Sequence, residues 1–149
     1  MKAVVQRVAS ASVEVDDIKV SEIGKGLMIL LCVMKDDEEK DLEYLVKKCA
    51  GLRIFDDADG VMNLNVSDVT GEILVVSQFT LAGNVKKGYR PSYVTAAGHE
   101  KATPLYTEFC RRLHEASGCV VRTGVFGADM QVALVNDGPV TIIVDSRQI

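Results

Sequence analysis

The chain has 149 residues, of which 48% are hydrophobic and 26% are charged, and its formal net charge at pH 7 is −4. These values are typical of a soluble globular protein, and we expect one domain over residues 1–149. The negative charge argues against binding nucleic acid through a broadly basic surface, so any contact with RNA has to be local. The longest apolar run, residues 27–34, is far shorter than the roughly 20 residues of a membrane helix. Residues 1–15 carry charges and lack the apolar segment of a signal peptide, which predicts a cytoplasmic protein.

The first part of the chain is predicted to contain strands followed by one helix. Apolar residues alternate with polar ones on both sides of the pair Asp16-Asp17, which predicts a β-hairpin. The run "LMILLCVM", residues 27–34, predicts a fully buried strand. After Asp36 the apolar residues recur at helical spacing, which predicts an amphipathic helix ending near Gly51.

The middle of the chain is predicted to add two strands and a second helix. "RIF", residues 53–55, favours a short strand, and the β-branched run in "EILVVSQFTL", residues 72–81, favours a central one. The second helix is expected to end near Gly118. It has two candidate starts: Pro104 is its first residue, or the helix begins near His99 and contains the proline.

The last part of the chain consists of two apolar runs, "VALV" and "VTIIVD", that are separated by "NDGP". Asn, Asp, Gly and Pro favour turns, and proline cannot donate to a sheet, so the simplest interpretation is a turn between two strands. Two main helices among many strands, without regular alternation, predict an α+β fold. Its sheet is expected to be mainly antiparallel or mixed, or to form a barrel-like core.

Several familiar chemical patterns are absent. "DDADG", residues 56–60, lacks the ligand spacing of a calcium loop and predicts a turn. His99 and His114 belong to no HExxH pair, and each is expected at the surface near a helix edge. The four cysteines form no CxxC pair, which favours buried reduced thiols over disulfides or zinc ligands. They are Cys32, Cys49, Cys110 and Cys119. We therefore expect no metal site.

Two segments remain as candidates for function. In "SQFTLAG", Ser77, Gln78 and Thr80 follow an apolar strand, where they either face a ligand or cap the strand end. "NVKKGYRPSY" places positive charges beside Tyr89 and Tyr93, a combination that binds phosphates and stacks on bases. Its charges come from Lys86, Lys87 and Arg90. The alternative is an ordinary solvated loop.

These two motifs, followed by "TGVFGADMQVALVNDGPVT", resemble the D-aminoacyl-tRNA deacylases, and the resemblance extends from "MKAVVQRVASASVEV" to "DGPVTIIVD". It implies an enzyme that hydrolyses the ester joining a D-amino acid, or glycine, to the 3′-terminal adenosine of tRNA. It also implies a homodimer with active sites at the subunit interface, and no metal or organic cofactor. A tRNA-binding adaptor without catalysis and a hydrolase of small esters or amides are the alternatives.

The resemblance also implies roles for particular residues. Backbone N–H groups around Phe79 and Thr80 would stabilise the developing oxyanion, while Ser77 and Gln78 shape the same pocket. Water would attack with help from the ribose 2′-hydroxyl, because the sequence offers no base to activate Thr80.

Further residues would bind the substrate or reject L-amino acids. The tRNA would be held by Lys86, Lys87 and Arg90. The terminal adenosine and aminoacyl group would lie near Ala102, Phe126 and Met130, for which core packing is the competing interpretation. The resemblance implies a cis peptide bond between Gly138 and Pro139, which enter the partner's pocket and exclude an L side chain.

Overall fold

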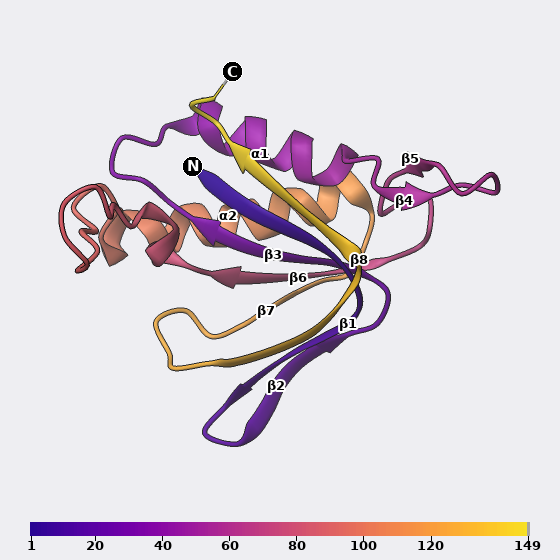
Figure 1. Cartoon of the computed structure of the whole chain (residues 1–149), viewed down its shortest axis with the longest axis horizontal. Coiled ribbons are helices and arrows are strands. Elements are labelled where there is room, and N and C mark those ends of the chain that lie inside the picture. Colours follow the sequence, from indigo (N-terminus) through magenta and orange to yellow (C-terminus); the bar gives the residue numbers. More distant parts are fainter. Residues whose placement is uncertain (149) are drawn as a thin grey trace.

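The structure, a computed structural model that describes residues 1–148, is a mixed β-sheet with two helices (Figure 1). Five strands lie in the order β2-β1-β3-β6-β7, and β8 pairs with β1 outside this path. The strands are β1 (Lys2–Val15), β2 (Ile18–Ile23), β3 (Gly26–Cys32), β6 (Glu72–Ser77), β7 (Val121–Thr123) and β8 (Gln131–Asp145). The helices are α1 (Glu39–Gly51) and α2 (His99–Ser117). The predicted α+β fold with a mixed, barrel-like sheet is therefore confirmed.

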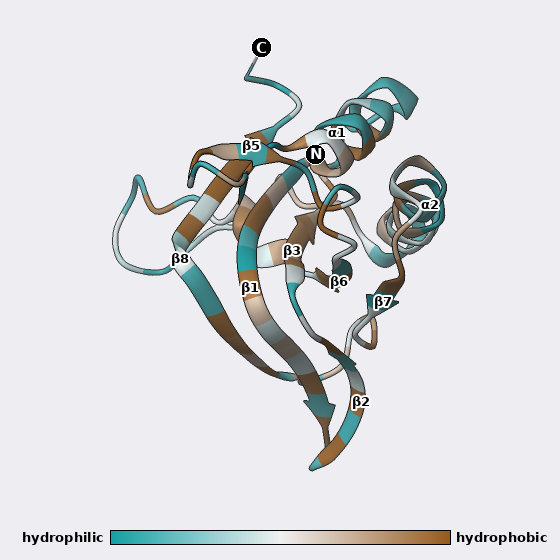
Figure 2. Cartoon of the chain, turned by 90° about the vertical axis from the view of Figure 1, so that its right-hand side faces the viewer, coloured by the Kyte–Doolittle hydropathy of each residue, from teal (hydrophilic) through white to brown (hydrophobic). Residues whose placement is uncertain are grey.

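Strand β1 is long enough to organise both ends of the sheet. Its first half pairs with β3 and its second half with β2, and β8 runs antiparallel to it along both halves. Figure 2 shows β1 and β8 as two long curved strands side by side. The hairpin predicted around Asp16 and Asp17 is confirmed, and both residues adopt positive φ in its turn.

Apolar side chains fill both faces of the central sheet. Strands β3 and β6 are parallel and almost entirely buried, which explains their continuous apolar sequences. Leu27, Ile29 and Leu31 belong to the larger core, which also contains residues of the helices. Met28 belongs to the second core with residues of β1, β2 and β6. The curved sheet thus has one core against the helices and a second core formed by the strands themselves.

The two helices follow their predicted apolar patterns. Helix α1 ends at Gly51, as expected, and begins with a capping box in which Glu38 N–H donates to Asp41 Oδ2 at 2.8 Å. Helix α2 begins at His99, so the second of the two candidate starts is correct and Pro104 lies inside the helix. It ends at Ser117, and Gly118 follows with a φ of 67°, the left-handed cap typical of glycine.

Two predicted strands had the wrong bounds. The short strand β4 (Phe55–Asp56) pairs with β5 (Met62–Leu64) across the turn predicted in "DDADG", and it shares only Phe55 with "RIF". The strand predicted over residues 72–81 ends at Ser77, and a 3-10 helix, η1 (Phe79–Ala82), follows it. The apolar residues after Gln78 therefore belong to a tight helical turn.

The turn predicted between "VALV" and "VTIIVD" is also wrong, because both runs belong to the single strand β8. Gln6 pairs with Thr141 and Val8 pairs with Asn136, so β1 advances two residues while β8 advances five. The extra residues form a projection, residues 137–140, which we call the bulge. Both apolar runs pair with the same neighbour, β1, and no reversal of direction is needed.

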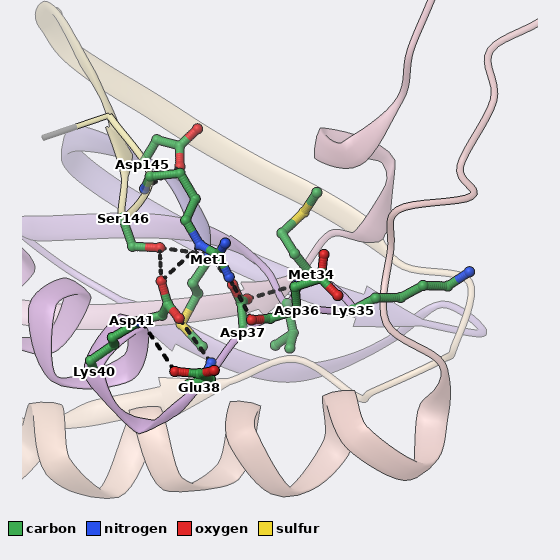
Figure 3. A network of polar contacts seen from close by, with 12 residues as sticks. Met1, Met34, Lys35, Asp36, Asp37, Glu38, Lys40, Asp41, Asp145 and Ser146 are labelled. Carbon is green, nitrogen blue, oxygen red and sulfur yellow. Dashed lines mark hydrogen bonds and ion pairs between the residues drawn. The ribbon is translucent and has the colours of Figure 1, made fainter.

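The first and last parts of the chain meet beside α1 (Figure 3). The amino group of Met1 donates to Asp37 Oδ1 and to Ser146 Oγ, the latter at 2.8 Å. Ser146 Oγ–H donates to Asp41 Oδ1 at 2.6 Å, and Arg147 Nε donates to the same oxygen at 3.1 Å. Because Met1, Asp37 and Asp41 are almost fully buried, these bonds compensate the charges and hold the end of β8 against α1.

Three of the four cysteines are buried and all four are free thiols, whereas Cys110 is half-buried. Within residues 1–148, neither helix is long and apolar enough to cross a bilayer.

Candidate active site

A cleft of about 630 Å³ opens where the ends of several elements meet. It is bordered by the ends of β3 and β6, by η1, by the start of α2 and by the segment before β8. Six of the predicted site residues line it: Ser77, Gln78, Phe79, Ala102, Phe126 and Met130.

The end of β6 supplies the polar side of the cleft. Gln78 N–H still donates to Leu31 O at 2.8 Å, and the chain then turns into η1. The first N–H groups of a helix have no acceptor within it. Among residues 1–148, the N–H groups of Phe79 and Thr80 donate no backbone hydrogen bond. These donors are available to an oxygen atom of a ligand.

The side chain of Thr80 is exposed and Thr80 does not line the cleft. Its Oγ1 accepts a hydrogen bond from Gln78 Nε2. Within the described chain no histidine, lysine or carboxylate bonds to this hydroxyl, so the structure offers it no general base.

The apolar side of the cleft comes from α2 and from the segment before β8. The rings of Phe126 and Tyr106 lie edge to face, with centroids 5.6 Å apart. Tyr106 is buried and its hydroxyl donates to Val75 O at 2.8 Å, which fixes the ring. Burial raises the pKa of Tyr106 well above its ordinary value, so the hydroxyl stays protonated as this donor. Phe126 therefore rests on a rigid support.

The basic loop, residues 84–93, lies next to the cleft and contributes Tyr93 to its lining, but not its basic side chains. Asn84 and Ser92 exchange backbone hydrogen bonds of 2.8 and 2.9 Å, which close the neck of the loop. The three basic side chains, Lys86, Lys87 and Arg90, are exposed, and within residues 1–148 none of them forms a salt bridge. The Tyr93 ring packs edge to face on Phe79 with centroids 5.2 Å apart, so the loop is joined directly to η1.

The bulge on β8 lies apart from the cleft of the same chain. The Gly138–Pro139 peptide bond is cis, as the resemblance implied, and both residues are exposed and absent from the cleft lining. Asn136 Oδ1 accepts from Val140 N–H at 2.8 Å across the neck of the bulge. Buried Arg7 donates through Nε to Asp137 O at 2.8 Å. The bulge is thus a well-supported projection.

The sequence interpretation of His99 was incomplete. His99 is exposed, as predicted, but it also lines the cleft at the first residue of α2. Residues three apart on a helix share a face, and His99 precedes the predicted site residue Ala102 by three. That spacing could have predicted His99 as a lining residue. The sequence left the start of α2 open between His99 and Pro104, so the spacing could not be used.

Comparison with known proteins decides the family. The family model described as D-Tyr-tRNA(Tyr) deacylase matches residues 4–145. The chain belongs to this deacylase family. Family membership makes the chain one of a group of hydrolases that act on ester bonds.

Two curated relatives of the deacylase match along almost their whole length. A D-aminoacyl-tRNA deacylase of Porphyromonas gingivalis is 56% identical over 147 residues, covering 99% of this chain and 98% of the relative. A protein of the same name from Magnetococcus marinus is 54% identical, covering 97% and 96%. The described motifs therefore lie in a chain whose full length is similar to these relatives.

The deacylase fold also occurs in solved structures. One, titled c-Myc DNA Unwinding Element Binding Protein, superposes with a TM-score of 0.91 at 43% identity and covers 97% of this chain and 98% of its own. Another, titled as a probable eukaryotic D-amino acid tRNA deacylase, has a TM-score of 0.81 at 20% identity with the same coverage, which shows the shared fold.

Proposed function

We propose that this protein hydrolyses the ester bond of D-aminoacyl-tRNA, and of glycyl-tRNA, releasing free tRNA and the amino acid. The observation that carries the proposal is the pair of free N–H groups of Phe79 and Thr80 where β6 ends beside the cleft. Membership of the deacylase family, whose model matches residues 4–145, supports it.

The chemistry requires positioned donors more than a strong nucleophile. An aminoacyl ester is already activated, so donors that stabilise the oxyanion and a well-placed water molecule provide much of the catalysis. Free N–H groups of Phe79 and Thr80 provide these donors, while Ser77 and Gln78 shape the pocket. The ribose 2′-hydroxyl of the substrate assists the water, because the Thr80 hydroxyl has no base.

Discrimination against L-amino acids is assigned to the bulge of a second copy of the chain. Gly138 and Pro139 project into solvent and do not reach the cleft of their own chain. The strand that carries the bulge exposes apolar side chains at Val132, Val135 and Ile143, with exposed fractions of 37, 57 and 74%. A homodimer covers such a surface and brings each bulge to the partner's cleft, where its bulk rejects an L side chain.

The remaining site residues are assigned to the tRNA. Lys86, Lys87 and Arg90 contact phosphates, because they are exposed and free of ion pairs within the described chain. Ala102, Phe126 and Met130 form the wall beside the terminal adenosine and the aminoacyl group.

A deacylation assay with D-tyrosyl-tRNA and L-tyrosyl-tRNA tests the function, and Phe79→Pro tests the amide donors. Proline fits the first position of a helix, and Gln78 before it, with φ −142° and ψ 81°, lies outside the α region that a following proline disfavours. Loss of this donor is expected to lower kcat by about 10²–10³-fold.

Phe79→Ala is the matched control, because it removes the ring but retains the N–H group. It is expected to keep far more activity than Phe79→Pro. Equal activity of the two variants would contradict the role of the amide. Binding of tRNA without release of amino acid would favour an adaptor, and hydrolysis of small esters without RNA would favour a general esterase.

A further inference from the structure

Three aromatic rings form a continuous row from the core to the cleft. Tyr106 is anchored in the core, Phe126 packs on it, and the His99 ring packs on Phe126 with centroids 5.0 Å apart and planes at 76°. The row therefore ends at His99, the exposed member that lines the cleft.

The His99 ring is also confined from a second side. A Cβ atom on Gly127 would lie 3.1 Å from His99 Cε1, so the ring lies close against the Gly127 backbone. His99 is the first residue of α2, and its backbone is thereby part of a regular helix. Contact with both Phe126 and Gly127 gives the imidazole a defined orientation beside the cleft.

His99 is chemically distinct among the described residues around the cleft. The lining includes no lysine or arginine, and His99 is its one basic side chain. Within residues 1–148 neither ring nitrogen of His99 bonds to a protein group, in contrast to His114, whose Nδ1 lies 2.7 Å from Cys119 O. Because the His99 side chain is also exposed, the part of the ring that does not contact Phe126 or Gly127 is available to a ligand.

We propose that His99 binds the purine base of the terminal adenosine by stacking on its imidazole ring, which Phe126 holds in place from the side. Aromatic side chains are common platforms for unpaired bases, because every base presents a π-face. The polar end of the cleft at Ser77 and Gln78 suits the ester, whereas the aromatic wall suits the base. This assignment rests on the proposed function and adds a specific ligand contact to it.

Kinetics with D-tyrosyl-tRNA test the contact through a set of variants. His99→Ala is expected to raise KM about five- to tenfold while kcat changes less than twofold, because stacking holds the base in both ground and transition states. His99→Phe retains a ring and is expected to restore most of the lost affinity. Glu100→Gln, at the adjacent exposed position outside the cleft, is the matched control with unchanged KM.

An unchanged KM in His99→Ala, a loss confined to kcat, or a His99→Phe variant as weak as His99→Ala would each overturn the stacking proposal. A wild-type protein that releases no amino acid would contradict the proposed function instead, and the following measurement then decides the contact alone.

NMR of the imidazole groups gives this independent readout, because the chain has two histidines. Titration of the full chain with millimolar AMP is expected to shift the His99 resonances and to leave those of His114 unchanged, with a smaller effect from CMP. His99→Ala assigns the signals. Absence of a selective His99 shift would overturn the proposal.

Discussion

The end of β6 and the bulge of β8 are both places where a strand leaves its regular pairing, but they differ in what they leave free. At the end of β6, the N–H groups of Phe79 and Thr80 donate no backbone hydrogen bond within the described residues, and Phe79 lines a cleft built by the same chain. In the bulge, the Asn136 side chain and Arg7 occupy backbone groups and hold an exposed projection in place. The end of β6 can therefore bind a ligand within its own chain. The bulge is a rigid projection that we propose acts in the cleft of a partner subunit.

The largest effect is expected when the two regions are damaged in different chains and then combined. Gly138→Ala disrupts the bulge, because a Cβ atom there would lie 2.4 Å from Val140 N. Phe79→Pro disrupts the cleft. Each variant alone is expected to be nearly inactive, because Phe79→Pro removes an oxyanion donor and a displaced bulge no longer closes the partner's cleft around the aminoacyl group. After joint unfolding and refolding, about half of the dimers are mixed, and roughly a quarter of all sites combine an intact cleft with an intact bulge.

Recovery of roughly a quarter of wild-type deacylase activity is therefore the expected outcome. Both variants must fold and form dimers, which circular dichroism and sedimentation check. If mixed dimers form and activity stays at the level of the separate variants, cleft and bulge do not act across the interface.

The next largest effect concerns the basic loop, whose charged side chains lie outside the lining of the cleft. Replacing Lys86, Lys87 and Arg90 with glutamine is expected to lower the slope of log affinity against log salt by about 0.7–0.9 per lost phosphate contact. The preference for D- over L-tyrosyl-tRNA should stay unchanged, because phosphate contacts carry no information about the amino acid. Filter binding over a range of salt concentrations measures both affinity and slope. An unaltered slope would show that these side chains make no contact with tRNA phosphates.

A smaller effect is expected when the contact between the end of β8 and α1 is weakened at Asp41, because the bulge has supports of its own. Burial raises the pKa of Asp41, but hydrogen bonds from Ser146 and Glu38, with the Met1 ammonium group and Arg147, outweigh it and lower the pKa below its ordinary value. Because the folded-state pKa is the lower one, this stabilisation is complete above the unfolded pKa near 4 and is lost as pH falls through the folded value. Asp41→Asn is expected to reduce the free energy of unfolding by about 1–3 kcal/mol at pH 7.

The same variant should flatten the acid side of the stability profile, which chemical denaturation at several pH values measures. Activity per folded molecule is expected to stay unchanged, because Asn136 and Arg7 hold the bulge locally. A change in D/L preference would show that the end of β8 also sets the geometry of the bulge.

The smallest effect is expected at Thr80 itself. Thr80→Ala keeps the backbone N–H group and removes a hydroxyl that lies outside the cleft lining, so kcat should stay within about threefold of wild type. Single-turnover deacylation measures this rate. A covalent aminoacyl adduct trapped on Thr80 would contradict the expectation and identify the hydroxyl as a nucleophile.

Local patterns predicted the elements whose apolar residues follow a single clear pattern. The apolar spacing of α1 and the continuous run of β3 were sufficient, because each pattern suits one secondary structure. The end of β6 was misplaced because the apolar residues of η1 continue the composition of the strand. Among the site residues, the motif led to Ser77 and Gln78, but the sequence could not show that Thr80 lies outside the cleft lining.

The sequence by itself determined the first hairpin, the buried strand β3, the two helices and the polar motif at the end of β6, because residue periodicity and composition act over a few neighbouring positions. Only the tertiary structure decided that "NDGP" is a bulge within one strand, since that outcome depends on β1 pairing with both apolar runs of β8. It likewise placed His99 beside Phe126 and Gly127, residues far away in the sequence, because the start of α2 packs against the segment before β8. Contacts between distant segments fix such positions, and no local pattern encodes them.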